Sequence, residues 1–148
     1  TGRITMRWKM WPQIFAAGGL FACLLLITAA PLQAEEIIAS GQFYGTHHPT
    51  SGRAILVARD GGGYEIRFED FASDDGPDIF IYLSTAEEPQ TDAAISNARN
   101  ENLGPRKALS GDQSYILPEG VSPDAFKSVA VWCRTYSVMF GAAALEKP

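Results

Sequence analysis

Cysteine and histidine are scarce in this chain of 148 residues, which holds two of each. The cysteines are Cys23 and Cys133, and the histidines are neighbours at His47 and His48. So few cysteines exclude a small domain that is held together by several disulfides. So few histidines leave little choice for a general base or for a metal site built from imidazoles.

The common catalytic and nucleotide-binding motifs are absent as well. The chain has no G-x-S-x-G elbow, no H-E-x-x-H motif, no Walker-type glycine loop, no dinucleotide fingerprint and no C-x-x-C-H haem attachment. A nucleophile pair of Cys133 with His47 or His48 lacks a third residue to orient the histidine. No hydrolase or transferase constellation is therefore identified, and whether the protein is an enzyme stays open because redox chemistry needs none of these motifs.

One long apolar run lies near the start of the chain, from Ile14 to Ile27, behind two basic residues. Its length of about 14 residues is typical of a secretory signal and short for a membrane span. We expect residues 1–34 to be a signal peptide that is cleaved after Ala34. The protein would then be exported to the periplasm or the extracellular space and would keep no stable membrane span.

Two alternatives to simple cleavage stay open. The apolar run could be retained as an anchor. Cys23 could also carry a lipid, but Phe21 is bulky where a small residue is wanted and the apolar run continues past the cysteine. With the signal removed, Cys133 is the only cysteine left, which rules out an intramolecular disulfide.

The predicted mature chain, residues 35–148, has the size of one domain. It contains all 17 acidic residues and 9 of the 12 basic ones, so its net charge is −8. This charge opposes binding to nucleic acids and to anionic membrane surfaces. A chain of this length buries about two-thirds of its surface and needs no disulfide to fold.

Short apolar or alternating segments between glycine, proline and aspartate predict an all-β fold. We expect strands at residues 37–43, 54–59, 64–69, 78–84, 113–117, 128–133 and 138–145. A glycine turn at residues 60–63 joins two of them into a hairpin, and residues 85–102 are expected to be mainly a surface loop. The prediction is a small single-domain β-sandwich or flattened β-barrel of about seven short antiparallel strands.

Metal and cofactor sites have few candidate residues. A type 1 copper site needs two histidines, a cysteine and usually a methionine, which His47, His48, Cys133 and Met139 would supply. Such sites usually take one histidine from just after the cysteine, and none follows here. Haem with a His, Met or Cys ligand is a second possibility, and a pair of exposed loop histidines with no ligand is a third.

The acidic stretch at residues 69–78 raises the question of calcium, which binds several carboxylate oxygens. Its spacing departs from the EF-hand pattern and no distal glutamate follows. A solvated turn rich in aspartate and glycine is the preferred interpretation.

Cys133 itself allows two interpretations. Val129, Val131 and Cys133 share one face of a predicted strand, where a free cysteine packs as a small apolar side chain. An unpaired thiol is nevertheless unusual in an exported protein, and Arg134 lies next in sequence, where a positive charge would favour the thiolate.

Several short segments carry a family resemblance when they are taken in chain order. They are Gly41-Gln42-Phe43, His48 to Ala54, Gly76 to Ser84, Leu103-Gly104, Gly111 to Pro118, Ser128 to Cys133 and Phe140 to Ala143. In this order they resemble the DM13 domain, which is found in secreted bacterial proteins and, beside DOMON domains, in animal extracellular proteins. The resemblance covers residues 40–145, nearly all of the predicted mature chain.

The resemblance implies a β-rich extracytoplasmic domain whose hallmark is a cysteine in a Trp-Cys context, the position held by Cys133. It also implies electron transfer or redox chemistry. Our leading hypothesis is an exported redox domain centred on Cys133, with Trp132, Tyr136 and Phe140 shaping a pocket and a redox protein or other extracytoplasmic protein as partner. The alternative is a non-enzymatic β-sandwich binding module in which Cys133 is buried packing.

Overall fold

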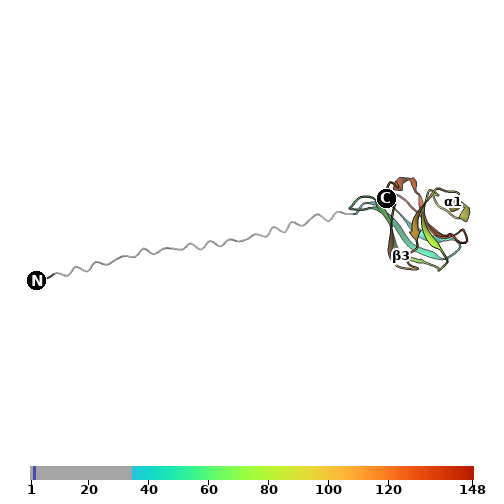
Figure 1. The fold of residues 1–148 in the computed structure, drawn as a ribbon, viewed down its shortest axis with the longest axis horizontal. Helices are drawn as coiled ribbons and strands as arrows, with labels where there is room; N and C mark the ends of the chain where they lie inside the picture. Colours follow the sequence, from blue (N-terminus) through green and yellow to red (C-terminus); the bar gives the residue numbers. More distant parts are fainter. Residues whose placement is uncertain (1, 3–34) are drawn as a thin grey trace. The chain divides into compact units, whose positions relative to one another are not determined.

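The structure, a computed structural model, describes Gly2 and residues 35–148, which form an all-β domain (Figure 1). The expected signal peptide, its cleavage site and Cys23 lie outside the described residues. The strands are β1 (Ile37–Gly45), β2 (Thr50–Ala58), β3 (Tyr64–Ser73), β4 (Ile79–Ser84), β5 (Asn100–Pro105), β6 (Gln113–Ile116), β7 (Ser128–Cys133) and β8 (Val138–Ala144). A short helix α1 (Asp92–Ser96) and a 3₁₀ turn η1 (Pro123–Ala125) complete the secondary structure.

All eight strands pair antiparallel, in the order β5-β4-β7-β8-β1-β2-β3-β6. The edge strands β5 and β6 approach each other, so the sheet is nearly closed. The fold class predicted from the sequence is confirmed: a single small all-β domain of the flattened-barrel kind.

Strand β1 belongs to both walls of this flattened barrel. Its first part, up to Gln42, pairs with β2, and its last part, from Phe43 to Gly45, pairs with β8. Gly41 lies at the crossover, where a Cβ atom would stand 1.7 Å from the carbonyl oxygen of Ala144. The two walls therefore meet at a point that accepts only glycine.

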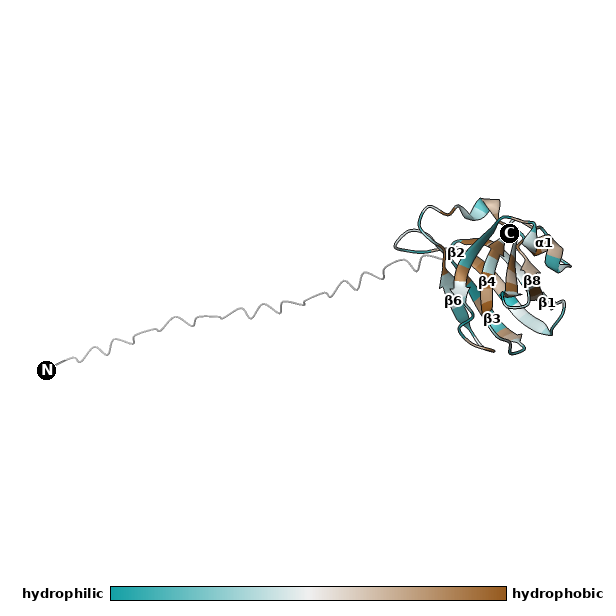
Figure 2. Cartoon of the chain, turned by 45° about the vertical axis from the view of Figure 1, so that its right-hand side comes forward, coloured by the Kyte–Doolittle hydropathy of each residue, from teal (hydrophilic) through white to brown (hydrophobic). Residues whose placement is uncertain are grey.

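The core fills the space between the walls, as the brown inner segments of the strands in Figure 2 indicate. Strand β7 is buried along its whole length. Its residues alternate between two apolar clusters: Val129, Val131 and Cys133 point into the main core, and Ala130 and Trp132 point to the outer face. The sequence prediction that the first three share one face is confirmed.

The outer face of β7 and β8 is covered by α1. Thr91 caps this helix by accepting a hydrogen bond from the Ala94 amide at 3.2 Å, and Ile95 is the buried residue that packs beneath it. The Trp132 ring stacks near Tyr82, with ring centroids 6.3 Å apart. Both faces of β7 are thus closed to solvent, which explains why its sequence is continuously apolar.

The structure differs from the sequence prediction in two places. Strand β5 begins inside residues 85–102, the segment expected to be mainly loop, and runs on to Pro105; it is a polar edge strand with no fully buried residue, so it has no apolar signature. Strands β2 and β3 also run further than expected, because Gly52 and Asp70, both with positive φ, lie at an irregularity within the ladder and not in a turn.

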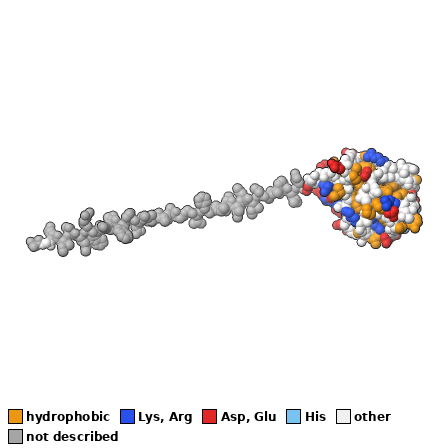
Figure 3. Space-filling view, in the orientation of Figure 1, with side chains coloured by type: hydrophobic (Ala, Val, Ile, Leu, Met, Phe, Trp, Pro, Cys, Tyr) orange, Lys and Arg blue, Asp and Glu red, His pale blue; other side chains and the backbone are white. Residues whose placement is uncertain are grey.

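The antiparallel topology gathers four connections at one end of the barrel: β1–β2, β3–β4, β5–β6 and β7–β8. Cys133 ends β7 at this same end. On the face seen in Figure 3, acidic, basic and apolar side chains are interspersed, so the negative charge is not gathered there into one patch. Among the described residues, no helix has the length and apolar character needed to span a membrane.

The crossover in β1 generates a stability prediction. Gly41→Ala should lower the free energy of unfolding by about 2–4 kcal/mol, since the new methyl group meets backbone and no flexible side chain. Gly61→Ala is the matched control: a Cβ there meets nothing within 4 Å, so the change should stay within about 1 kcal/mol. Urea unfolding of both variants checks this, and equal stabilities would contradict the close approach.

Candidate functional site

Cys133 is a free cysteine that is fully buried at the end of β7. It pairs across the sheet with Ile79 on one side and Val138 on the other. Its thiol donates a hydrogen bond to the carbonyl oxygen of Pro77, with sulfur and oxygen 3.1 Å apart. Because Pro77 is itself exposed, the sulfur lies only one backbone layer below the surface.

A cleft of about 430 Å³ lies on the outer side of this backbone layer. It is lined by His47, His48, Asp75, Gly76, Pro77, Tyr136, Val138 and Phe140. The structure therefore brings four of the predicted site residues together, the two histidines with Tyr136 and Phe140, and places Cys133 behind the Pro77 wall of the same cleft.

The floor of the cleft is formed by Phe140. The His48 ring stacks on the Phe140 ring with centroids 3.8 Å apart, and the Phe140 carbonyl accepts backbone hydrogen bonds from Thr46 and His48. Gly76 approaches the same ring so closely that a Cβ atom would stand 2.7 Å from it. The turn that carries the histidines and the β3–β4 connection are therefore both seated on Phe140.

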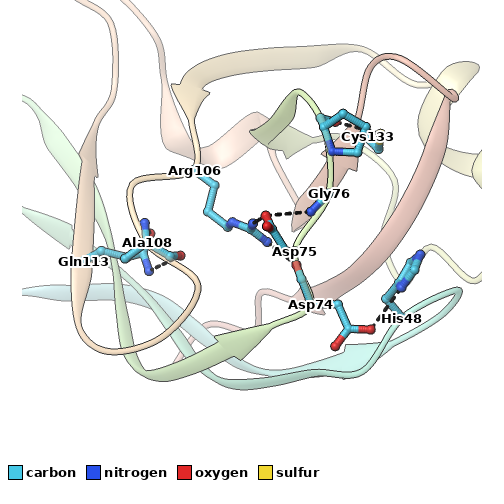
Figure 4. Close-up of polar contacts among 9 residues, drawn as sticks. His48, Asp74, Asp75, Gly76, Arg106, Ala108, Gln113 and Cys133 are labelled. Atoms are coloured by element: carbon cyan, nitrogen blue, oxygen red, sulfur yellow. Dashed lines mark hydrogen bonds and ion pairs between the residues drawn. The ribbon is translucent and has the colours of Figure 1, made fainter.

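The β3–β4 connection, residues 74–78, is a strip of irregular backbone held by polar contacts (Figure 4). The Arg106 guanidinium donates to the Asp74 carbonyl at 2.6 Å and reaches the Asp75 carboxylate at 3.4 Å. The Asp74 carboxylate is 3.1 Å from His48 Nδ1, and the Asp75 carboxylate accepts from the Gly76 amide at 2.8 Å. These contacts hold the strip over Cys133.

Arg106 is the buried member of this set, with its side chain only 6% exposed. Burial lowers the pKa of its guanidinium, and the nearby Asp75 charge acts in the opposite direction. An arginine remains protonated in proteins even so. A permanent positive charge therefore anchors the strip from below.

Arg134 does not act on the thiol in the way that its sequence position suggested. Its guanidinium forms two hydrogen bonds with the Asp78 carboxylate, at 2.8 and 3.0 Å. It also lies 3.5 Å from the centroid of the Phe80 ring. Phe80 alternates with the core residues Ile79 and Ile81, so this pair occupies the outer face of β4, and its charge is already matched by Asp78.

Trp132 and Met139 lie apart from the cleft. Both belong to the second apolar cluster under α1, on the side of the sheet opposite to Cys133. The reason is the alternation of side chains along β7 and β8, which sends neighbouring residues to opposite faces. Trp132 therefore does not shape the pocket, and Cys133 and Met139 do not point toward a common centre.

The predicted cofactor ligands do not converge on one centre in this geometry. His47 Nε2 is 2.9 Å from Asp92 and His48 Nδ1 is 3.1 Å from Asp74, so each histidine has its own carboxylate. Within residues 35–148, no three His, Cys, Asp or Glu side chains are grouped as metal ligands. The residues fit neither a type 1 copper centre nor a haem pocket with Cys133 or Met139 as ligand.

Sequence reasoning missed the residues that hold the strip. Asp74 and Asp75 lie in the acidic stretch that was interpreted as a solvated turn, and both are indeed largely exposed. Arg106 follows an edge strand with no apolar pattern, so no local signal marks it as buried. The Gly76-Pro77 pair was visible only as part of the family resemblance.

The exposed pair of Asp78 and Arg134 generates a pH prediction. The hydrogen bonds from Arg134 lower the pKa of Asp78 below its ordinary value. The pair thus stabilises the fold above the pKa of the unfolded state, and this contribution is lost as the pH falls through the lower pKa of the folded state. Asp78→Asn should therefore be slightly less stable than wild type at neutral pH and equal to it in strong acid.

The measurement is urea unfolding of both proteins from neutral pH down to the acid limit. Asparagine tolerates the positive φ of 58° at this position, so the variant isolates the charge. The effect should be small because the pair is exposed and screened. A difference that persists unchanged in acid would contradict this origin.

Comparison with known proteins identifies a family. The family model described as electron transfer DM13 matches residues 42–145. No curated protein and no solved structure shows a significant match to the chain. The matched segment contains the cleft, the strip of residues 74–78 and Cys133. The chain belongs to the DM13 family of electron-transfer domains.

Proposed function

We propose that this protein is an exported redox domain whose reactive centre is Cys133, reached through the cleft at the Pro77 wall. Family membership supports a general role in electron transfer and suggests a protein as redox partner. The observation that carries the proposal is the hydrogen bond between the Cys133 thiol and the carbonyl of exposed Pro77. Displacement of the backbone at Pro77 would expose the Cys133 sulfur to the cleft.

The proposed chemistry is thiol–disulfide exchange with the partner. The Cys133 thiol loses its proton to solvent, and the thiolate attacks one sulfur of a partner disulfide. One S–S bond forms between the two proteins, and the other partner sulfur leaves as a thiolate. The step is reversible, it conserves electrons between the two proteins, and it needs no second cysteine in this domain.

A second candidate is a non-enzymatic binding module, and one observation favours it. Cys133 has no exposed surface and its thiol already has a hydrogen-bond acceptor, as in a cysteine that only fills the core. In that case the cleft would bind a protein or glycan and the sulfur would take no part.

The two candidates differ in how the thiol becomes accessible. If only the strip opens, a neutral thiol reagent should label Cys133 even at low urea concentration. The labelling rate should then hardly change with urea concentration, because local opening exposes little surface. Arg106→Gln removes the charged anchor of Asp74 and Asp75 and should raise this rate about tenfold, the equivalent of ~1.4 kcal/mol.

The measurement follows labelling of Cys133 by intact mass spectrometry at a series of urea concentrations. Global unfolding of the same protein is measured over the same urea range for comparison. Arg59→Gln is the matched control, since Arg59 lies at the opposite end of the barrel, and its labelling rate should equal that of wild type. If labelling follows global unfolding in wild type and in Arg106→Gln alike, the cysteine-centred function is wrong and the binding module stands.

A further prediction concerns absorbance. Cys133 and Met139 lie in separate clusters and do not converge on a copper or haem site, so the protein purified from its expression host should show only aromatic absorption, both oxidised and reduced. Spectra from 250 to about 700 nm check this, since haem and thiolate-bound copper absorb strongly in the visible range. A Soret band or an intense thiolate-to-copper band would overturn the thiol mechanism.

A further inference from the structure

We infer that the cleft and its acidic rim, the aspartates at positions 74, 75, 78 and 92, form the docking surface for a partner protein with a basic face. The inference rests on the proposed function for the kind of partner, a redox protein that must come close to Cys133. Three features of the described residues support it: an apolar centre, an excess of negative charge around it, and a strip whose carboxylates are exposed and only loosely bound.

The centre of the surface is apolar and one aromatic ring stands free. Tyr136 is 68% exposed at the tip of the β7–β8 turn, beside Ser137, which has a positive φ of 54°. Val138, Phe140 and Pro77 continue the apolar lining into the cleft. Protein interfaces commonly combine an aromatic-rich centre with a polar rim, and this end of the barrel has that arrangement.

The rim carries four carboxylates and they are unequally neutralised. Arg134 pairs with Asp78, and Arg106 reaches Asp75. Asp74 and Asp92 form ion pairs only with His48 and His47, which are charged only if protonated, and Asp92 also accepts a hydrogen bond from the Met139 amide at 2.7 Å. The rim is therefore negative when the histidines are neutral, in a domain whose net charge is already −8.

Charge complementarity then selects the partner. A negative rim steers a positively charged protein toward the cleft and disfavours an acidic one. The larger cavity of about 670 Å³, at the opposite end beside the β2–β3 turn, lies away from Cys133 and does not serve this purpose.

Docking of a basic face would also weaken the hold on the strip. Asp75 is 83% exposed and is bound to Arg106 only by a long 3.4 Å contact, and Asp74 is 52% exposed. A lysine or arginine of the partner competes with Arg106 and His48 for these carboxylates. The same contacts that recognise the partner therefore favour exposure of the sulfur behind Pro77.

The test uses cytochrome c, a basic redox protein, as the probe, and succinylated cytochrome c, whose lysines carry carboxylates, as the matched control. Titration of the isotope-labelled protein by NMR should give a Kd for the native probe that weakens at least tenfold between about 10 and 150 mM salt. Shifts should concentrate at Gly76, Tyr136 and Val138. The succinylated probe should not bind.

Variants locate the surface. Tyr136→Ser should weaken binding about fivefold without loss of stability, because the ring is exposed. Asp75→Asn should weaken binding two- to fivefold and reduce its salt dependence. Glu119→Gln removes an exposed acid at the opposite end and should leave the Kd unchanged. Equal binding of both probes, or shifts centred elsewhere, would overturn the inference.

Cys133→Ser separates this inference from the proposed function. The variant keeps a donor for the Pro77 carbonyl and should bind the native probe as wild type does. Binding together with an inert thiol in the labelling experiment would uphold the docking surface and overturn the cysteine centre. A reactive thiol without binding would overturn the docking surface alone.

Discussion

The hydrogen bond from the Cys133 thiol to the Pro77 carbonyl connects the edge of the core to the surface of the molecule. On the inner side, the sulfur ends a strand that is buried on both faces and paired on both edges, so it cannot move without the core. On the outer side, Pro77 belongs to a strip that is held by side-chain contacts from Arg106 and His48 and, at Asp78, from Arg134. The strip thus separates a firmly held sulfur from solvent, and in the proposed function access to Cys133 depends on movement of this strip.

The strip is stable because its polar groups and the Arg106 guanidinium supply each other with hydrogen-bond partners. Arg106 is buried, and a buried guanidinium requires acceptors, which the Asp74 carbonyl and the Asp75 carboxylate provide. Gly76 lets the strip lie against Phe140, where any larger residue would collide with the ring. The packing of the strip and the charge of its anchor are therefore coupled. Loosening the anchor should free the strip without disturbing the strands beneath, which stay paired by backbone hydrogen bonds.

The parts of the fold that the sequence predicts are those with a periodic apolar signal. The continuous apolar run of β7 and the alternation of Tyr64, Ile66 and Phe68 in β3 place these strands correctly. The polar edge strand β5 has no such signal and was missed. The cleft was only partly predictable: the adjacent histidines and Tyr136 lie in connections that antiparallel topology brings to one end, whereas Arg106 is buried by tertiary packing that no local pattern records. Cys133 and Trp132 are neighbours in sequence, yet strand geometry sends them to opposite faces.

A solitary thiol limits what kind of redox domain this can be. It cannot store a disulfide within the domain, and Cys133 and Met139 do not converge on a metal or haem, so a disulfide form of Cys133 requires a second molecule with a thiol or disulfide. Recognition of that molecule then becomes part of the chemistry, since an uncovered thiolate would react with any disulfide or oxidant present. In the proposed mechanism, burial behind Pro77 suppresses such side reactions, and a positively charged partner displaces the strip by binding its carboxylates. In the proposed mechanism the acidic rim and the buried sulfur act together: the strip and its rim set the selectivity for the partner, and Cys133 supplies the reactivity.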